Sequence, residues 1–298
     1  PESADCLDRA LTLVRANPRS APEVAPRLAV DLIELSYPLG RLPESIKNYE
    51  SIHADAIRSL GPQHPASREL AVALARGRIR LGQWEQGAAE LTAVLDGIGT
   101  QAEAASSSLV RTIQKALALV HLDMERYRDA EVLLDDILAT ELRERGPDHI
   151  EIAKAKLRLA RVYTETERLR AAEESLVAAE KIARAWNRDD GGVILNIDLN
   201  RAWLRLRQQR ADDAIAILSD IKKRVAGADA SGFDQSYTED RPLALAYLQK
   251  GDTAKGLALL DGARATSERH LGSDHPITLQ IAQELGAIKQ PVRLLADK

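Results

Sequence analysis

The chain has 298 residues, of which 45% are hydrophobic and only 3% are aromatic, and its formal net charge is −4. The small charge gives no case for nucleic acid or a membrane surface as a partner, and the scarcity of aromatic residues argues against a β-rich core. One cysteine, Cys6, excludes a disulfide framework and a cysteine metal cluster. No run of 18 apolar residues occurs, so we expect no membrane-spanning segment.

The chain begins at Pro1, and its only methionine is Met124. We therefore expect a cut fragment or a processed product, from which a targeting segment could have been removed. A lone thiol is typical of a reducing compartment, and the excess of arginine over lysine is typical of a GC-rich bacterial source. The expected location is accordingly the cytoplasm of a bacterium.

Apolar residues recur with helical spacing in paired segments along the chain. In chain order, we expect helices over residues 3–16, 23–37, 43–60, 66–81, 83–96, 107–123, 126–145, 150–165, 168–186, 192–208, 211–225, 236–249, 252–271 and 277–289. Small residues recur in the second helix of each pair, at steps of 42 or 43 residues: Ser45, Gly87, Ala130, Ala172, Ala214 and Gly256. A fixed period of this length indicates stacked helix pairs, each too small to bury a core alone.

The small residue of each second helix has a physical role. Two antiparallel helices approach closely only where neither carries a bulky side chain, so we expect Ala160 to face Ala172 at a helix crossing. We also expect Gly40, Gly82 and Gly251 to end first helices in the left-handed conformation.

Most first helices carry a Leu-Ala or Leu-Gly pair, and two carry an aromatic residue one turn later. The pairs begin at Leu74, Leu117, Leu159, Leu243 and Leu285, and the aromatic residues are Tyr163 and Tyr247. This pattern resembles the tetratricopeptide repeat (TPR). The 42-residue period and the punctuation Leu60-Gly-Pro-Gln-His-Pro65, found again at 146–149 and 271–276, resemble the kinesin light chain type of that repeat.

The resemblance implies an all-α fold: a right-handed α-solenoid, or superhelix, of about six TPR-like helix pairs with flanking half-repeats. We expect a single repeat domain over 1–298. Its parts are a half-repeat over 1–18, repeats over about 22–64, 65–106, 107–148, 149–190, 191–232 and 233–274, and a half-repeat over 275–298.

No pattern typical of catalysis or of metal binding stands out. The phosphate-binding, dinucleotide-binding, zinc-protease and nucleophile-elbow motifs are all missing, and Gly97-Ile-Gly99 is interpreted as a loop pair. His64, His149 and His275 recur because the repeats recur, so we expect them in loops or helix caps. We therefore predict no enzyme activity, no cofactor and no metal site.

The candidate binding residues lie on first helices, on the side that faces the concave surface in TPR proteins. They are Arg76, Arg80, Lys115, Lys154, Arg158, Arg161, Asn196, Asn200, Trp203 and Arg207. Lys154, Arg158 and Arg161 share one helical face, and a basic lining on a mildly acidic protein favours an acidic peptide. An ordinary solvated surface is the alternative, and Trp203 is interpreted either as a ligand contact or as a packing residue.

Two functions stay open. The first is a non-enzymatic protein–protein interaction module, which binds a partner protein or acidic peptide on its concave face within a larger signalling or regulatory protein. The second is a domain that senses a peptide or small ligand and controls an attached kinase or DNA-binding effector. Neither involves direct contact with nucleic acid or a membrane, and uncapped repeat ends allow self-association.

Overall fold

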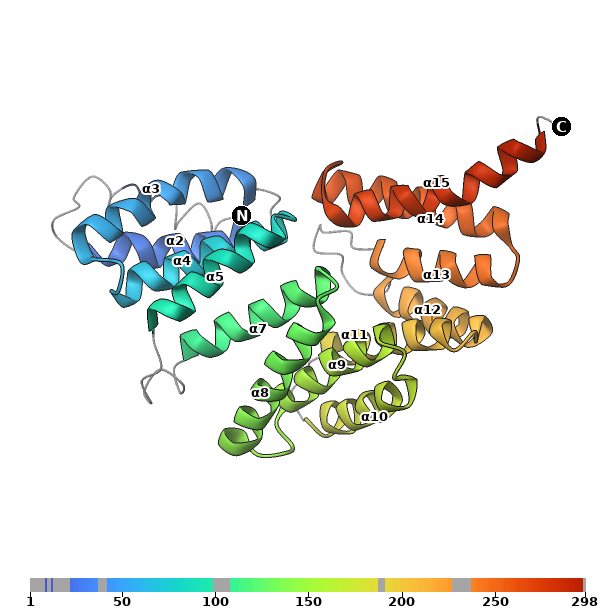
Figure 1. The fold of residues 1–298 in the computed structure, drawn as a ribbon, viewed down its shortest axis with the longest axis horizontal. Coiled ribbons are helices and arrows are strands. Elements are labelled where there is room, and N and C mark those ends of the chain that lie inside the picture. The colour runs from blue at the N-terminus through green and yellow to red at the C-terminus, as the bar shows by residue number, and fades with distance from the viewer. Residues whose placement is uncertain are drawn as a thin grey trace. The chain divides into compact units, whose positions relative to one another are not determined.

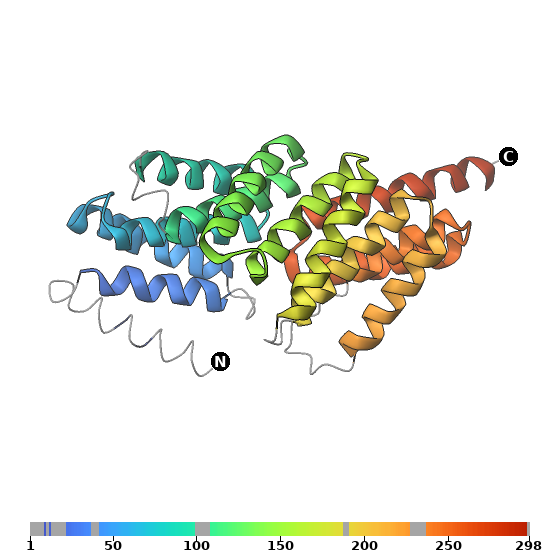
Figure 2. The same cartoon turned by 90° about the horizontal axis from the view of Figure 1, so that it is seen from below.

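A computed structural model describes residues 9, 12, 22–36, 42–98, 108–186, 191–226 and 237–296. This part of the chain contains thirteen α-helices and no strand (Figures 1 and 2). They are α2 (Val24–Ser36), α3 (Leu42–Leu60), α4 (Pro65–Arg80), α5 (Trp84–Ile98), α7 (Ser108–Asp123), α8 (Tyr127–Arg145), α9 (Ile150–Glu165), α10 (Leu169–Ala185), α11 (Gly191–Arg207), α12 (Ala211–Ala226), α13 (Tyr237–Gln249), α14 (Thr253–Leu271) and α15 (Pro276–Ala296). The predicted all-α class and the predicted helices from 23 onward are confirmed.

The chain divides into two compact units, Pro1–Arg126 and Tyr127–Lys298. The predicted half-repeat over 3–16 and the turn at Gly40 lie outside the described residues, apart from 9 and 12. Helix α15 continues to Ala296, beyond the predicted end at 289. Because the boundary separates α7 from α8, the third predicted pair is divided between the units, and the single domain over 1–298 stays a prediction.

In the first unit, α4 is the central helix. It packs against α2, α3, α5 and α7 (Figure 1). Its buried Leu70 and Leu74 join a core with Ile33, Ile46 and Tyr49 from the two preceding helices. Neighbouring first helices therefore lie side by side here, since α2 and α4 each begin a helix pair.

The second unit repeats the same arrangement from α8 to α15 (Figures 1 and 2). The pairs α9–α10, α11–α12 and α13–α14 pack internally, and the first helices α9, α11 and α13 also contact in sequence. Ala160, Ala172 and Leu176 are fully buried in one cluster with Ile197 of the next repeat. Each apolar stripe is thus covered both by its own pair and by a neighbour, as a stacked repeat requires.

The predicted close helix crossing is confirmed at two glycines of the recurring series. A Cβ atom built on Gly87 would lie 2.8 Å from the carbonyl oxygen of Ala75, and one on Gly256 would lie 3.1 Å from that of Ala244. The Cβ atom built on Gly256 would also lie 2.5 Å from Leu248 Cγ. The second helix therefore rests on the backbone of the first at the position where Ala172 stands in the fourth repeat.

The described turns inside the repeats use one left-handed residue each, and only some of these residues are glycines. Gly82 and Gly251 have φ values of 80° and 84°, as predicted. Glu125, Glu167 and Gln209 occupy the same place with φ near 60°. The left-handed turn is thus a property of the repeat, and the flanking packing holds it even where the residue carries a Cβ.

Gly256→Ala and Gly286→Ala make the same chemical change at a crossing and at an open site. Gly256→Ala forces a methyl group into Leu248, so the free energy of unfolding should fall by about 1–3 kcal/mol. A methyl on Gly286 in α15 meets no atom within 4 Å. There the better helix propensity of alanine should raise stability by about 0.5–1 kcal/mol. Thermal melts followed by circular dichroism measure both, and equal shifts would contradict the crossing.

Candidate binding face

Ion pairs join neighbouring first helices one repeat apart. The Glu34 carboxylate of α2 forms ion pairs with two residues of α4, Arg76 at 2.8 Å and Arg80 at 2.9 Å. Glu165 of α9 pairs with Arg207 of α11 at 2.5 Å. The contact partners on adjacent first helices are 42 to 46 residues apart in sequence. We call the side of the first helices that carries these residues the first-helix face.

Three of the basic residues predicted for this face are therefore already paired. Arg76, Arg80 and Arg207 each contact a carboxylate from the preceding repeat. Arg207 also lies 3.6 Å from Glu167. A guanidinium fork matches carboxylate geometry, so these contacts reduce the positive charge that the sequence pattern indicated for the face.

Helix α9 carries three of the other four basic residues, and these three differ among themselves. Lys154 lies 3.2 Å from Glu151, one turn earlier on the helix. Arg161 is half-buried. Arg158 has no hydrogen bond or ion pair within the described part of the chain, although burial lowers the pKa of its guanidinium and only Glu151 offsets that effect. Arg158 is thus a half-buried cation with no ion pair in the described part of the chain, and Glu151 attracts it only from beyond ion-pair distance.

The polar residues of α11 are held along their own helix. The Asn196 side chain donates to the Gly192 carbonyl, and the Asn200 side chain donates to the Asn196 carbonyl, both at 2.8 Å. By the spacing of the ion pairs, Asn196 is expected beside Lys154 and Asn200 beside Arg158, because α9 and α11 are neighbours. Their side-chain carbonyl oxygens can accept hydrogen bonds at this face.

Trp203 packs against apolar neighbours, and an arginine side chain lies over its ring. Its ring contacts a small apolar cluster that includes Leu206 and Ala246. The Arg241 guanidinium lies 5.2 Å from the ring centre, and Arg241 pairs in turn with Glu284 at 2.6 Å. Lys115, the remaining candidate, is half-buried on α7 in the first unit. The candidates of the second unit therefore gather on α9 and α11, whereas Arg76, Arg80 and Lys115 belong to the first unit.

Ion pairs also join the second helices of neighbouring repeats, which we call the outer helices. Arg168, which precedes α10, makes two 2.7 Å hydrogen bonds to Glu131 of α8 and lies 4.5 Å from the Tyr163 ring. The hydrogen bonds from Arg168 lower the pKa of the Glu131 carboxyl, although partial burial opposes this. These pairs join segments that are 37 residues apart, so sequence periodicity within one helix does not reveal them.

The recurring histidines cap helices, as predicted. His64, His149 and His275 each accept a hydrogen bond at Nδ1 from the backbone N–H two residues later, at 3.2–3.3 Å. Across the residues described, no group of three His, Cys, Asp or Glu side chains could hold a metal ion.

Two segments of the chain match family models, and solved structures are similar to it. Residues 109–185 and residues 243–277 match two family models, both described as tetratricopeptide repeat. A solved tetratricopeptide repeat protein from Parabacteroides merdae is 18% identical, with a TM-score of 0.50, over 89% of this chain and 98% of that one. A structure of kinesin light chain nearly identical TPR-like repeats from Podosopora anserina is 19% identical, with a TM-score of 0.46, over 70% of this chain and 98% of that one.

No curated protein matches the chain. Among the described helices, none is both long enough and apolar enough to cross a membrane.

Glu131→Gln removes the charge that Arg168 binds and leaves the shape unchanged. At pH 7 we expect a loss of about 1 kcal/mol or less in the free energy of unfolding, because Arg168 is 43% exposed. The pKa of Glu131 is lower in the folded state, so its contribution is present above the ordinary value of 4.5 and is lost as the pH falls below it. Urea unfolding from pH 7 to pH 3 measures this.

The difference between wild type and Glu131→Gln should therefore shrink toward low pH. Glu174→Gln is the matched control, because Glu174 is 67% exposed and, in the described part of the chain, its ion pair is with Arg170 on the same helix. A constant difference across the pH range would contradict a native-state shift in the pKa of Glu131.

Proposed function

The chain is a tetratricopeptide-repeat protein, and on that premise we propose that it binds a partner peptide or protein along its first-helix face. Repeats of this family imply a protein–protein interaction module, and their fold is generally a scaffold without catalysis. The face formed by first helices is the concave one in such folds. The proposal includes an acidic segment as the ligand and a place within a larger signalling or regulatory protein.

The state of Arg158 is the observation that carries the proposal. Arg76, Arg80 and Arg207 have carboxylate partners, whereas Arg158 has none in the described residues. A cation that has lost much of its hydration and lacks a counter-ion is destabilising until an anion reaches it. A carboxylate on a bound peptide would supply that anion with directional hydrogen bonds.

The surroundings of Arg158 support a peptide. Lys154 lies one turn before it and Arg161 one turn after it on α9. The 42-residue spacing predicts that Asn196 and Asn200 of α11 lie alongside, because α9 and α11 are in contact. Cations and amide oxygens in one row can bind both a side-chain carboxylate and a peptide backbone N–H. Trp203 is already packed, so we assign it a supporting role.

A sensing function is the second candidate, in which a peptide or small ligand controls an attached effector. A small pocket in the first unit favours it, because a scaffold does not need one. A cytoplasmic location, supported by the lone cysteine, and self-association through repeat ends stay predictions.

The double variant Arg158→Glu, Arg161→Glu tests the proposed face. Peptides selected from a random library by wild-type protein should be rich in Asp, Glu or a free carboxyl terminus, and should bind more weakly as salt rises. The double variant should lose at least about tenfold in affinity, since reversing a desolvated charge leaves the ligand carboxylate unpaired. Fluorescence anisotropy measures both.

Arg170→Glu is the matched control, because Arg170 is 94% exposed on the outer helix α10. It makes the same charge change away from the first-helix face and should leave the affinity unchanged. An unchanged affinity in the double variant, with circular dichroism intact, would move the site to the outer helices or the loops and would refute the proposal.

A further inference from the structure

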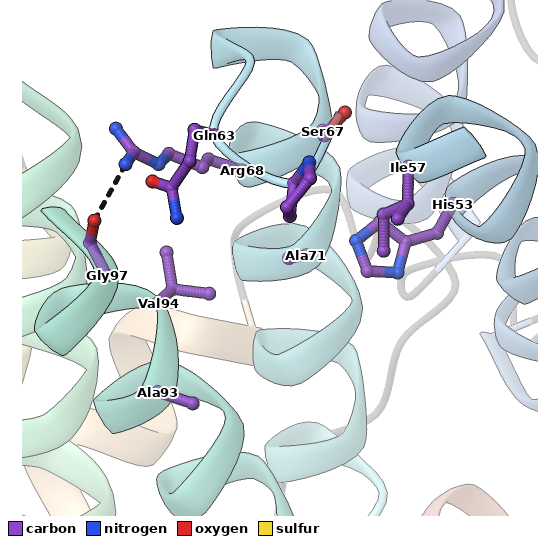
Figure 3. Close-up of a pocket in the computed structure, with 10 residues that line it drawn as sticks. His53, Ile57, Gln63, Ser67, Arg68, Ala71, Ala93, Val94 and Gly97 are labelled. Atoms are coloured by element: carbon purple, nitrogen blue, oxygen red, sulfur yellow. Dashed lines mark hydrogen bonds between the residues drawn. The ribbon is translucent and has the colours of Figure 1, made fainter. Parts of the chain in front are cut away.

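A pocket of about 190 Å³ lies in the first unit, between the outer helices α3 and α5 and over the N-terminal half of α4 (Figure 3). Its lining consists of His53, Ile57, Pro62, Gln63, Ser67, Arg68, Ala71, Ala93, Val94 and Gly97. Figure 3 shows Arg68 and Gln63 reaching toward Gly97 on one side, with His53 and Ile57 on the other side and Ala71 between them. The pocket thus combines apolar walls with several polar groups.

The second unit contains three corresponding helices, which carry larger apolar side chains at some of the positions that line the pocket. Helices α3, α4 and α5 begin at Leu42, Pro65 and Trp84, and α8, α9 and α10 each begin 85 residues later. The caps His64 and His149 keep the same offset. The second set of three helices is therefore an internal reference for the first set.

Three pocket residues are smaller or more polar than their counterparts in that reference. His53, Ser67 and Gly97 stand where the reference has Leu138, Ile152 and Ile182. These three apolar side chains belong to one packed cluster, in which Ile152 is fully buried. At these three positions the first unit thus lacks apolar side chains that pack together in the second, although Arg68 and Val94 are larger than their counterparts Ala153 and Ala179.

The polar groups at the pocket favour an anion. Among the described residues that line it, Arg68 is the one with a permanent charge, and none is Asp or Glu. Arg68 donates one hydrogen bond to the Gly97 carbonyl at 2.8 Å, which orients the guanidinium at the rim and leaves its other N–H groups available. The pocket also adjoins the N-terminus of α4, whose first turn has no acidic residue and whose dipole favours negative charge.

Two further groups of the pocket are unsatisfied or neutral. The Ser67 hydroxyl is buried and has no hydrogen-bond partner in the described structure. Burial and then the nearby Arg78 lower the pKa of His53, while Glu90 and a hydrogen bond with the Ser67 backbone oppose them, so the pocket favours the neutral imidazole. A neutral ring can flank an apolar ligand without a desolvated charge.

We propose that this pocket binds a small monocarboxylate whose body is a single ring or a short branched chain. The carboxylate would meet Arg68 and Gln63, and the body would lie against Ile57, Ala71 and Val94. The size agrees, since an engineered protein cavity of about 150 Å³ holds one benzene molecule. This site lies on the outer helices and is separate from the first-helix face, on which Arg76 and Arg80 lie.

Benzoate is the probe, and amide chemical shifts of the full chain in an NMR titration are the measurement. We expect saturable shifts confined to residues around α3–α5, with a dissociation constant on the order of 1 mM for so small a ligand. Benzyl alcohol lacks the charge and acetate lacks the ring, so each should bind at least about fivefold more weakly than benzoate.

Two variants test separately how much the Arg68 charge and the open space of the pocket contribute to binding. Arg68→Met should weaken benzoate at least about fivefold and leave benzyl alcohol unchanged. Gly97→Ile restores the side chain found at Ile182 and should abolish the binding of both. A Cβ on Gly97 meets only the Gln63 side chain, at 3.6 Å or more, so the variant should fold, and its melting temperature should not fall.

Equal binding of benzoate and benzyl alcohol, or benzoate binding that survives Arg68→Met, would overturn the carboxylate assignment. Shifts that persist in a folded Gly97→Ile protein, or no saturable shift with wild type, would overturn the pocket itself. Gly97→Ala provides a milder step, and its affinity should fall between those of wild type and Gly97→Ile.

Discussion

The arrangement depends on how closely two helices cross within each repeat. Where Gly87 or Gly256 meets the first helix, the neighbouring atoms leave no room for a Cβ. That contact brings the two helices of a pair together, and the fixed period then stacks one pair on the next. First helices consequently lie beside first helices, and a glutamate in one repeat meets an arginine one period later. The ion pairs of the first-helix face therefore follow from packing and are not independent features of the sequence.

Local charge balance, more than net charge, distinguishes the surfaces of this protein. Most arginines on first helices have a carboxylate nearby, which cancels their field and fixes the register between repeats. Arg158 and Arg68 differ from them in their surroundings. Within the described residues, the first is half-buried without an ion pair, and the second stands at the rim of a pocket that no acidic residue lines. The two anion sites that we propose therefore rest on local surroundings, on a chain whose net charge is −4.

Periodicity was sufficient to predict the helices, because every repeat supplies the same apolar stripe and the same small residue. It predicted the left-handed turns at Gly82 and Gly251 but missed Glu167, because nothing in the residue type indicates that conformation. It could not predict that Arg76 is paired, since the partner Glu34 lies one repeat away and the register between helices was unknown. Gly97 was interpreted as a loop residue, yet it belongs to α5. A pocket made by small residues leaves no positive signal in one sequence, and only comparison with the filled repeat reveals it.

The tryptophans are distributed unevenly over the two units. Trp84 begins α5 in the first unit, whereas Trp186 packs edge-on against His149 and Trp203 lies under Arg241 in the second. Intrinsic fluorescence can therefore distinguish the units once the other indoles are replaced by phenylalanine. Stacked repeats need not unfold in one step, because each supports only its neighbours. A chain with one indole in one unit and two in the other thus contains its own optical reporters of whether the halves melt together or in turn.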